Sequence, residues 1–253
     1  MRLPTPEPRP LPDISPPSAH GDFLARLSLA PGLHMCECDG ICIFLDIPGD
    51  RYFCLSPEQS ALVRKIAFAD MTDPPTNRML SFREALIRHR VLMSPGEARP
   101  LLPPTRTARA PGALRDLRAS VPPAMTSVLA ARVAHAALTT WWLEKRHRFE
   151  GVIAHMEQLK EKSPQVPRNK TPDWETLVAA FHDISPWLFT REDACRFRSI
   201  VLIRFLAGYG IAADWVFGVR LAPFGAHCWV EKGETVLNDQ ADRVREFTPI
   251  LRV

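Results

Sequence analysis

Proline is concentrated in two stretches of this 253-residue chain, and these stretches limit where folded structure can form. Residues 1–22 contain seven prolines, and residues 94–123 contain seven more. Proline lacks the backbone N–H that helices and sheets use, so neither stretch favours a long regular element. The distribution predicts four segments: a disordered tail (1–23), a folded module (24–93), a linker rich in Pro and Arg (94–124) and a second folded part (125–253).

The composition is that of a soluble globular protein, with 46% apolar and 24% charged residues. No apolar run approaches the roughly 20 residues that span a bilayer, and the N-terminus has no apolar signal core. Six scattered cysteines are too few for a disulfide scaffold in a chain of this length. We therefore expect a cytoplasmic protein without a membrane span. The net charge of +4 does not by itself indicate nucleic-acid binding.

The first folded stretch is predicted to hold three short strands followed by helices. Asp39-Gly40 and Pro48-Gly49-Asp50 are strong turn signals that separate the strands. Ser56 followed by Pro57 gives an N-cap with proline at the first helical position. This pattern is typical of a compact winged-helix-like module. Its predicted elements are strands at 34–37, 41–46 and 51–55 and helices from 57 onwards and at 81–91.

The second stretch combines helices with a small sheet, which predicts an α+β fold class. Helical periodicity covers 128–159 and 172–181, and another helix begins at or just before Cys195. Short strands follow at 213–220, 226–231 and 236–239. The fold predicted for this stretch is therefore a helix-borne cysteine packed on a small antiparallel sheet.

Cys195 is the first candidate for chemistry. A thiol at a helix N-terminus lies near unpaired N–H groups and the positive end of the helix dipole, and both lower its pKa toward the reactive thiolate. The backbone N–H of Cys195 is also a natural donor to an oxyanion. The alternative is that Cys195 is a small buried hydrophobe, which is the usual role of a single helical cysteine.

His227 and Asp239 fall on two neighbouring strand-like runs. If the three residues 232–234 form the loop between these runs, Glu231 pairs with Thr235, and His227 lies directly opposite Asp239. Opposed residues on one sheet face have Cβ atoms about 5 Å apart, so a carboxylate could hold the imidazole ring. The joint pattern predicts a Cys195–His227–Asp239 site of the kind that a thiol peptidase uses.

Other cysteines and histidines are given structural roles. Cys228 is predicted to belong to the core and to point away from the partners of His227, because neighbouring strand residues point to opposite faces. His34, Cys36, Cys38, Cys42 and Cys54 lack the paired spacing of structural zinc sites, so we expect no metal and no cofactor. The remaining histidines are interpreted as surface or packing residues: His135, His147, His155 and His182.

The C-terminal half resembles the leader peptidase of lasso peptide biosynthesis, the transglutaminase-like B protein. The resemblance covers about residues 125–253. It rests on Cys195 with Arg198-Ser199, on Gly218-Val219-Arg220 and Pro223-Phe224, and on Ala226-His227-Cys228-Trp229-Val230-Glu231 and Asn238-Asp239. It implies a papain/transglutaminase-like domain in which Cys195 is the nucleophile, His227 the base and Asp239 the orienting acid. The chain departs from the family pattern at Arg196, where an apolar residue is usual, and at Cys228, where a small residue is usual.

The N-terminal module resembles the precursor-recognition element of peptide-modifying systems, which is related to the pyrroloquinoline quinone peptide chaperone. The matching residues are Asp39-Gly40, Ile43-Phe44-Leu45-Asp46, Gly49, Tyr52-Phe53, Leu55 and the helix from Pro57. The resemblance implies that a leader peptide adds a strand beside the third strand and packs against the last helix, by β-augmentation. The implied leader-binding residues are Arg51, Tyr52, Phe53, Cys54, Phe82, Leu86 and Arg90.

Together the two resemblances predict a peptidase that binds a precursor peptide by its leader and cuts at the leader–core junction. The implied partner is an ATP-dependent, asparagine-synthetase-like cyclase that closes a macrolactam ring. Two alternatives stay open: an acyl transferase, in which an amine replaces water, and a non-enzymatic regulator that binds DNA or a peptide through the winged-helix-like module. The arginine-rich linker lacks the aromatic residues that stack on bases, so we expect no nucleic-acid partner.

Overall fold

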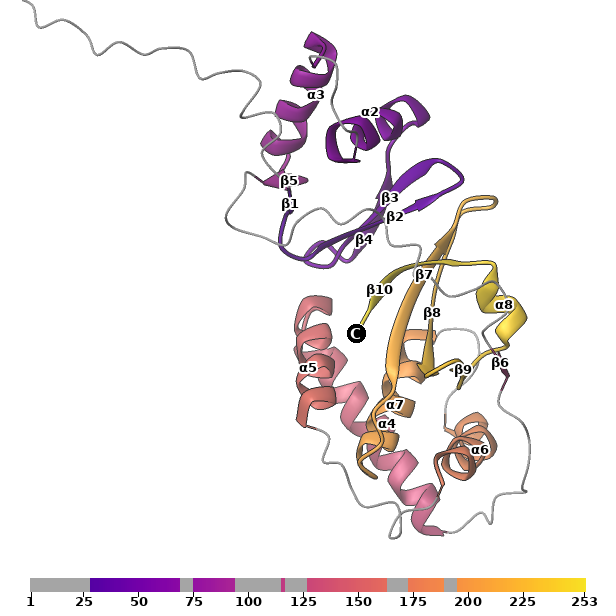
Figure 1. The fold of residues 1–253 in the computed structure, drawn as a ribbon. Coiled ribbons are helices and arrows are strands. Elements are labelled where there is room, and N and C mark those ends of the chain that lie inside the picture. The colour runs from indigo at the N-terminus through magenta and orange to yellow at the C-terminus, as the bar shows by residue number, and fades with distance from the viewer. Residues whose placement is uncertain (1–27, 69–74, 94–114, 117–126, 163–172, 189–194) are drawn as a thin grey trace, which may run out of the picture.

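The structure is a computed structural model that describes residues 28–68, 75–93, 115–116, 127–162, 173–188 and 195–253 (Figure 1). The predicted tail at 1–23 and most of the predicted linker at 94–124 lie outside these residues. The described elements combine helices with antiparallel strands, so the predicted α+β class is confirmed.

The N-terminal module is built on an antiparallel sheet of order β2-β3-β4. Its Asp39-Gly40 turn has φ values of 48° and 77°, a left-handed conformation that glycine adopts without strain. Helix α2 begins with a reciprocal capping box, in which Ser56 N–H donates to Gln59 Oε1 and Gln59 N–H donates to Ser56 Oγ. The elements are β1 (Ser28–Leu29), β2 (Leu33–Cys38), β3 (Ile41–Asp46), β4 (Arg51–Cys54), α2 (Pro57–Phe68), α3 (Asn77–Arg88) and β5 (Leu92–Met93).

The C-terminal part contains a five-stranded sheet of order β10-β7-β8-β9-β6. Two of its strands were not predicted. The last strand carries Pro249 and a register shift, both of which an edge strand tolerates. Because proline argues against a strand when the sequence is read alone, this strand was not predicted. Residues 115–116, in the predicted linker, form a short strand parallel to β9. The strands are β6 (Arg115–Asp116), β7 (Asp214–Arg220), β8 (Gly225–Lys232), β9 (Thr235–Val236) and β10 (Thr248–Arg252).

Helices cover this sheet, and α7 packs against both α4 and β8. The long helical run predicted for 128–159 is two helices, α4 and α5, separated at residues 147–148. The side chains of α7 are among the most buried, and Ile200, Leu202 and Leu206 have no exposed surface. The helical elements are α4 (Ser127–Arg146), α5 (Phe149–Lys162), α6 (Trp174–Ile184), η2 (Ser185–Trp187), α7 (Cys195–Ala207) and α8 (Ala241–Arg245).

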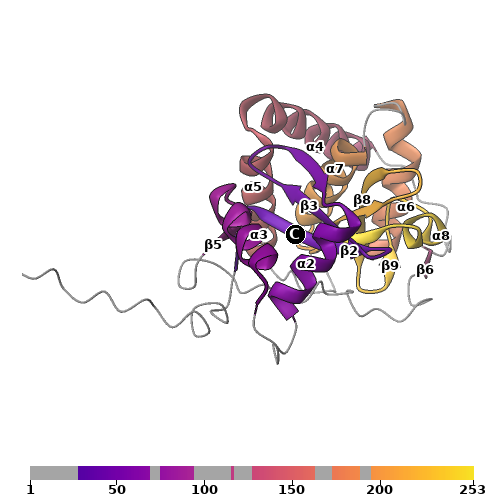
Figure 2. The same cartoon turned by 90° about the horizontal axis from the view of Figure 1, so that it is seen from above.

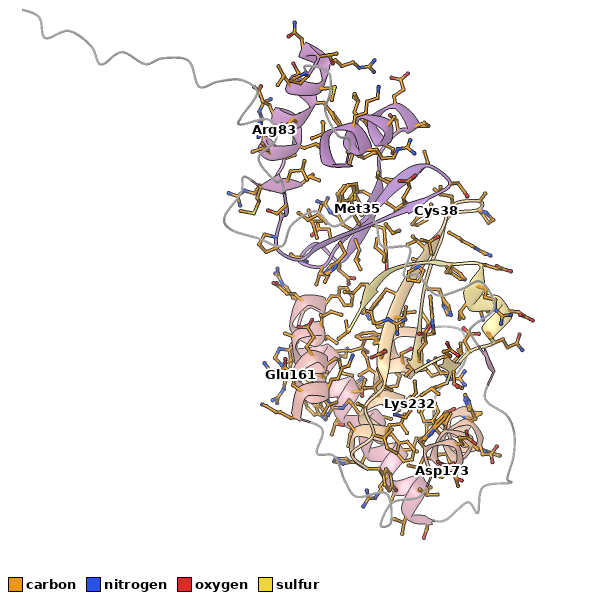
Figure 3. All side chains as sticks on the ribbon, viewed as in Figure 1. Met35, Cys38, Arg83, Glu161, Asp173 and Lys232 are labelled. Carbon is orange, nitrogen blue, oxygen red and sulfur yellow. The ribbon has the colours of Figure 1, made fainter. Side chains whose placement is uncertain are left out.

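The three-stranded sheet has an apolar core on each face. In Figures 1 and 2 it lies between α2 and α3 on one side and the C-terminal part on the other. The residues facing the C-terminal part belong to the same core cluster as α4, α5, α6 and α7, and they are Cys36, Cys38, Ile43, Leu45 and Ile47. The opposite face forms a smaller cluster of Cys42 and Phe44 with Val63, Leu86 and Leu92. Met35 and Cys38, both labelled in Figure 3, belong to different clusters because they point to opposite faces of β2.

None of the described helices is long and apolar enough to cross a membrane.

Candidate active site

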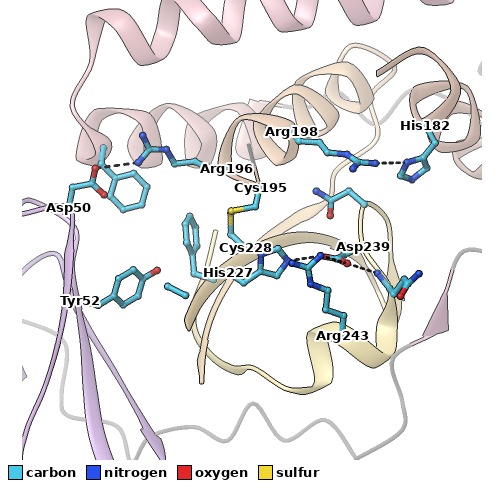
Figure 4. Close-up of a pocket in the computed structure, with 15 residues that line it drawn as sticks. Asp50, Tyr52, His182, Cys195, Arg196, Arg198, His227, Cys228, Asp239 and Arg243 are labelled. Carbon is cyan, nitrogen blue, oxygen red and sulfur yellow. Dashed lines mark hydrogen bonds and ion pairs between the residues drawn. The ribbon is translucent and has the colours of Figure 1, made fainter. Parts of the chain in front are cut away.

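Cys195 is the first described residue of α7 and is exposed to solvent. The next turns of the helix are buried, so the helix is held firmly while its first residue faces the pocket. The prediction of a helix at the cysteine therefore agrees with the structure. Figure 4 shows the sulfur of Cys195 between the N-terminal module and the residues of β8.

His227 on β8 is held by Asp239. Its Nε2 donates a hydrogen bond of 2.5 Å to Asp239 Oδ2, and the two side chains are only 10% and 12% exposed. The other carboxylate oxygen accepts the backbone N–H of Gln240 at 2.8 Å and lies 3.8 Å from Arg243 Nη1. Since Nε2 is directed to the carboxylate, Nδ1 is the ring nitrogen left for the thiol.

The strand register that led to this pair differs from the prediction. Glu231 pairs with Val236 and Lys232 with Thr235, so the turn holds two residues and not three. The register is shifted by one residue, and β9 ends at Val236. Gly233 occupies the turn with φ 60°, which makes the tighter two-residue connection possible. Asp239 reaches His227 from the bend that follows β9, not from a position opposite it in the ladder.

A buried hydrogen-bond network fixes that bend. Asn238 Oδ1 accepts the backbone N–H of Val230 at 2.8 Å, and its Nδ2 donates to Ser199 Oγ at 2.9 Å. Asn238 and Ser199 are buried. The amide therefore ties β8, the bend and α7 together one residue before Asp239. In the sequence, Asn238 and Ser199 stand out only as parts of a motif, and the motif alone predicts no role for either residue.

Aromatic rings support the imidazole. The ring centroid of His227 lies 5.3 Å from that of Phe247 and 6.0 Å from that of Trp229. Gly218 on the neighbouring strand permits this packing, because a Cβ at that position would lie 2.7 Å from the Trp229 ring and 2.9 Å from Phe247 Cβ. The histidine is thus oriented by a carboxylate at one edge and by rings around it.

The thiol and the imidazole form a charged pair. The pKa of Cys195 is lowered to about 4, and a hydrogen bond from the Cys228 thiol is the largest cause. Although the residue reaches solvent, its sulfur is partly covered, and this partial burial opposes the lowering. His227 and the backbone N–H of Cys228 add to the lowering. Burial lowers the pKa of His227, but hydrogen bonds to Asp239 and Cys195 outweigh it and raise that pKa to about 9. Between these values the site holds a thiolate and an imidazolium.

Cys228 has a role that its predicted place in the core did not suggest. It is buried, with 4% of its surface exposed, as predicted. Its thiol nevertheless contacts Cys195 by a hydrogen bond, and burial raises its own pKa well above the ordinary value. Cys228 therefore stays protonated and acts as a donor beneath the thiolate. The expectation that it points away from the site is wrong, because the helix end crosses this strand close enough for His227 and Cys228 both to reach the sulfur.

The site opens into a cavity of about 1090 Å³ that both parts of the chain enclose. The N-terminal module contributes Asp50 and Tyr52, and Figure 4 shows both on the side of the pocket away from Asp239. The C-terminal part contributes aromatic, polar and charged residues. These include Phe149, His182, Arg196, Arg198, Phe217, Ala226, Asn238, Gln240 and Arg243 beside Cys195, His227, Cys228 and Asp239.

His182 was interpreted as a surface or packing residue, but it lines this cavity. Its Nε2 donates to the carbonyl oxygen of Leu237 at 2.7 Å, and its Nδ1 accepts a hydrogen bond of 2.9 Å from Arg198 Nη2. Arg198 stands one helical turn after Cys195. His182 therefore joins α6 and α7 to the chain segment that carries Asp239, a role that only the tertiary structure could reveal.

The predicted leader-binding residues do not form one surface. Phe53, Phe82 and Leu86 belong to the small cluster on the α2 and α3 side of the sheet, and Leu86 is buried within it. Tyr52 packs on the opposite side, against the larger core and the pocket. The remaining three residues, Arg51, Cys54 and Arg90, are exposed. In the described sheet order β4 is an edge strand.

In the described ranges, no group of three or more His, Cys, Asp or Glu residues could hold a metal ion.

Comparison with known proteins identifies the C-terminal part. Residues 136–252 match the model of the transglutaminase-like superfamily and form a transglutaminase-like domain. Searches of curated proteins and of solved structures returned no match. A transglutaminase-like domain with this thiolate–imidazolium pair supports an activity of the cysteine peptidase or acyl transferase type.

Proposed function

We propose that this chain is a cytoplasmic cysteine peptidase that binds the leader of a ribosomally synthesised lasso peptide precursor and cleaves it at the leader–core junction. The observation that carries the proposal is the arrangement of Cys195, His227 and Asp239 in a cavity that the N-terminal module helps to enclose. Arg196 and Cys228, where the chain departs from the family pattern, both line this cavity and leave the three residues intact.

The chemistry follows from the charged pair. The Cys195 thiolate attacks the scissile carbonyl carbon, and the backbone N–H of Cys195 at the helix end stabilises the oxyanion. The His227 imidazolium donates its proton to the leaving amine of the core peptide. A water molecule, deprotonated by His227, then hydrolyses the thioester and releases the leader. Asp239 keeps the ring oriented and stabilises its charged form throughout.

The N-terminal module would hold the leader by strand addition. Among the described strands, β4 is the edge of its sheet, so its outer backbone groups can pair with an extended peptide. The amino-terminal end of β4 lies at the cavity, where Asp50 and Tyr52 line the wall. A leader that runs antiparallel to β4 therefore brings its carboxyl end to Cys195, and that end carries the leader–core junction. Holding the leader raises the local concentration of the scissile bond.

Partners follow from the proposed reaction. Cleavage frees the amino group of the core peptide, and the proposed partner is an ATP-dependent, asparagine-synthetase-like cyclase that joins this amine to an acidic side chain. The peptidase itself needs no cofactor, because the thiolate, the imidazolium and water complete the reaction.

The test is mass analysis of a synthetic leader–core peptide after incubation with the full chain in water enriched in heavy oxygen. Peptide hydrolysis predicts two fragments, with heavy oxygen in the new carboxyl group of the leader. Cys195→Ala should leave the peptide intact while binding it with unchanged affinity. An uncleaved peptide with the unmodified chain, or normal cleavage by Cys195→Ala, would contradict the proposal.

Acyl transfer is the second candidate, because the same thioester can be attacked by an amine in place of water and the superfamily match fits both reactions. Adding a primary amine to the same incubation separates the two. Transferase activity predicts a leader whose new end is an amide of that amine, formed in preference to the acid.

A further inference from the structure

Tyr52 and Phe53 are neighbours on β4 whose side chains have different surroundings. The Phe53 ring stacks on Phe44, with centroids 4.9 Å apart, inside the small cluster of the N-terminal module. The Tyr52 ring meets Phe224 of the C-terminal part edge to face at 6.3 Å and lines the catalytic cavity. Adjacent strand residues point to opposite faces, so one strand can hold a leader at its edge and present Tyr52 to the active site.

The loop before β4 is fastened beside the nucleophile. Asp50 accepts a hydrogen bond of 3.3 Å from Arg196 Nη1, and Arg196 directly follows Cys195. Arg196 Nε also donates to Glu144 at 3.1 Å, and its guanidinium lies over the Phe149 ring at 5.4 Å. These contacts hold the N-terminal end of β4 at a fixed place relative to α7, so Tyr52 forms a defined wall of the cavity.

This wall faces an apolar region of the cavity. Three aromatic rings, from Tyr52, Phe149 and Phe217, line this region together with Ala226, and the Asp50–Arg196 ion pair lies at its edge beside Phe149. Tyr52 is half-buried, and burial, followed by its proximity to Cys228 and Cys195, raises the pKa of its hydroxyl, so the ring stays neutral. Aromatic walls with few polar groups select apolar side chains.

We propose that Tyr52 is a specificity-determining residue that forms one wall of an apolar subsite for a side chain among the last residues of the leader. The inference rests on the proposed function. A leader held along β4 must pass Tyr52 before it reaches Cys195, so the side chain that enters this subsite belongs to the leader side of the scissile bond. The recognition module thus also selects the residues beside the bond that is cut.

Binding and cleavage of short junction peptides test the proposal. The peptides span the last four residues of the leader and the first four of the core, and one leader position at a time carries Leu or Gln. Binding is measured by fluorescence anisotropy in the Cys195→Ala background, and cleavage is measured with active Cys195. At one position we expect Leu to be favoured over Gln by about tenfold in both measurements.

Tyr52→Ala should reduce this preference to about twofold, whereas Tyr52→Phe should keep it, because the ring and not the hydroxyl forms the wall. Tyr52→Trp narrows the subsite and should move the preference toward smaller side chains, which gives a gain of selectivity that misfolding cannot produce. Phe53→Ala is the matched control on the same strand. It should keep the preference for short peptides and weaken only the binding of the full leader.

An undiminished preference for Leu in Tyr52→Ala, together with unchanged selectivity in Tyr52→Trp, would overturn the assignment of Tyr52. The absence of any preference in the unsubstituted chain would overturn it too. Failure of the proposed function gives a different result: peptides that bind with a Tyr52-dependent preference but are not cleaved.

Discussion

The two faces of the three-stranded sheet have different neighbours, although their residues alternate along the same strands. One face carries Phe44 and packs with α2 and α3 in a cluster that is local to the N-terminal module. The other carries Ile43 and Leu45 and belongs to the main core of the whole molecule. The module predicted to capture the leader therefore also supports the transglutaminase-like domain, and it contributes Asp50 and Tyr52 to the catalytic cavity.

This difference matters for how the parts can be separated. The sequence suggests two folded stretches joined by a linker, which invites deletion of residues 1–93. Such a deletion would expose the apolar surface that Ile43 and Leu45 cover, and we expect the remaining chain to be destabilised. Point variants on each face are therefore the better way to distinguish recognition from catalysis.

The largest effect is expected from loss of the nucleophile. Cys195→Ala should abolish cleavage of the leader–core peptide and leave the affinity for the leader unchanged, because its side chain faces the cavity and not the β4 edge. Phe53→Ala should do the reverse, with weaker leader binding and an unchanged rate of Cys195 alkylation. Anisotropy, mass analysis and alkylation with iodoacetamide measure the three quantities. If both variants lost binding and cleavage to the same extent, leader binding and catalysis would not be separate functions of the two faces.

Asp239→Asn should lower kcat/KM by roughly 10²- to 10⁴-fold, the usual range for disturbing a general acid–base residue. The carboxylate that orients His227 and raises its pKa is lost, while the shape of the side chain is retained. Glu246→Gln is the matched control, since its carboxylate accepts a hydrogen bond from Arg220 and not from His227. Steady-state kinetics on a junction peptide measure both. If Asp239→Asn were as active as Glu246→Gln, Asp239 would have no role in catalysis.

Substituting one leucine in each of the two core clusters allows the two cores to be compared directly. Leu45 and Leu86 are both buried, with 1% and 6% of their surfaces exposed, but they belong to different clusters. Each Leu→Ala change should lower the free energy of unfolding by about 2–5 kcal/mol. In hydrogen exchange, Leu45→Ala should loosen α7 and β8, whereas Leu86→Ala should loosen only α2 and α3. Identical exchange patterns would show that the faces are not energetically distinct.

The pH dependence of kcat/KM should be bell-shaped, with limbs near pH 4 and pH 9. Activity needs the thiolate, which is lost as the pH falls through the lowered pKa of Cys195, about 4. It also needs the imidazolium, which is lost as the pH rises through the raised pKa of His227, about 9. Initial rates on a junction peptide across this range measure both limbs. A plateau that begins only above pH 8 would show that no thiolate–imidazolium pair exists.

The smallest effect on kcat/KM at neutral pH is expected at Cys228. Its thiol is the largest cause of the lowered pKa of Cys195, so Cys228→Ala should move the acid limb of the pH profile to higher pH, while at neutral pH His227 still stabilises the Cys195 thiolate. Cys228→Ser retains a hydrogen-bond donor and should shift the limb less. If the limb stays in place in both variants, Cys228 is only a core residue.

Much of this architecture was predictable because local signals and tertiary structure agree. The strand at 41–46 coincides with β3, and Ser56-Pro57 marks the start of α2. The helix at Cys195 followed from its apolar periodicity. Where local rules compete, prediction was less accurate: Gly233 permits a tighter turn than predicted, and Pro249 hides an edge strand.

The residues that sequence reasoning missed lack a local signal. Asn238, His182 and Cys228 act through contacts between segments that are distant in sequence, and only the packing of α7 on β8 brings these contacts together. The split between Tyr52 and Phe53 depends likewise on which face of the module packs against the C-terminal part. Strand alternation predicts that the two side chains diverge, but not which of them faces the cavity.

The most direct test of the account is the rate of Cys195 alkylation by iodoacetamide as a function of pH, followed by peptide mapping because Cys54 is also exposed. We expect Cys195 to reach half of its maximal alkylation rate near pH 4 and to lose this reactivity at low pH in His227→Ala. A rate that rises only near pH 8.5, as for free cysteine, and that does not change in His227→Ala would contradict it.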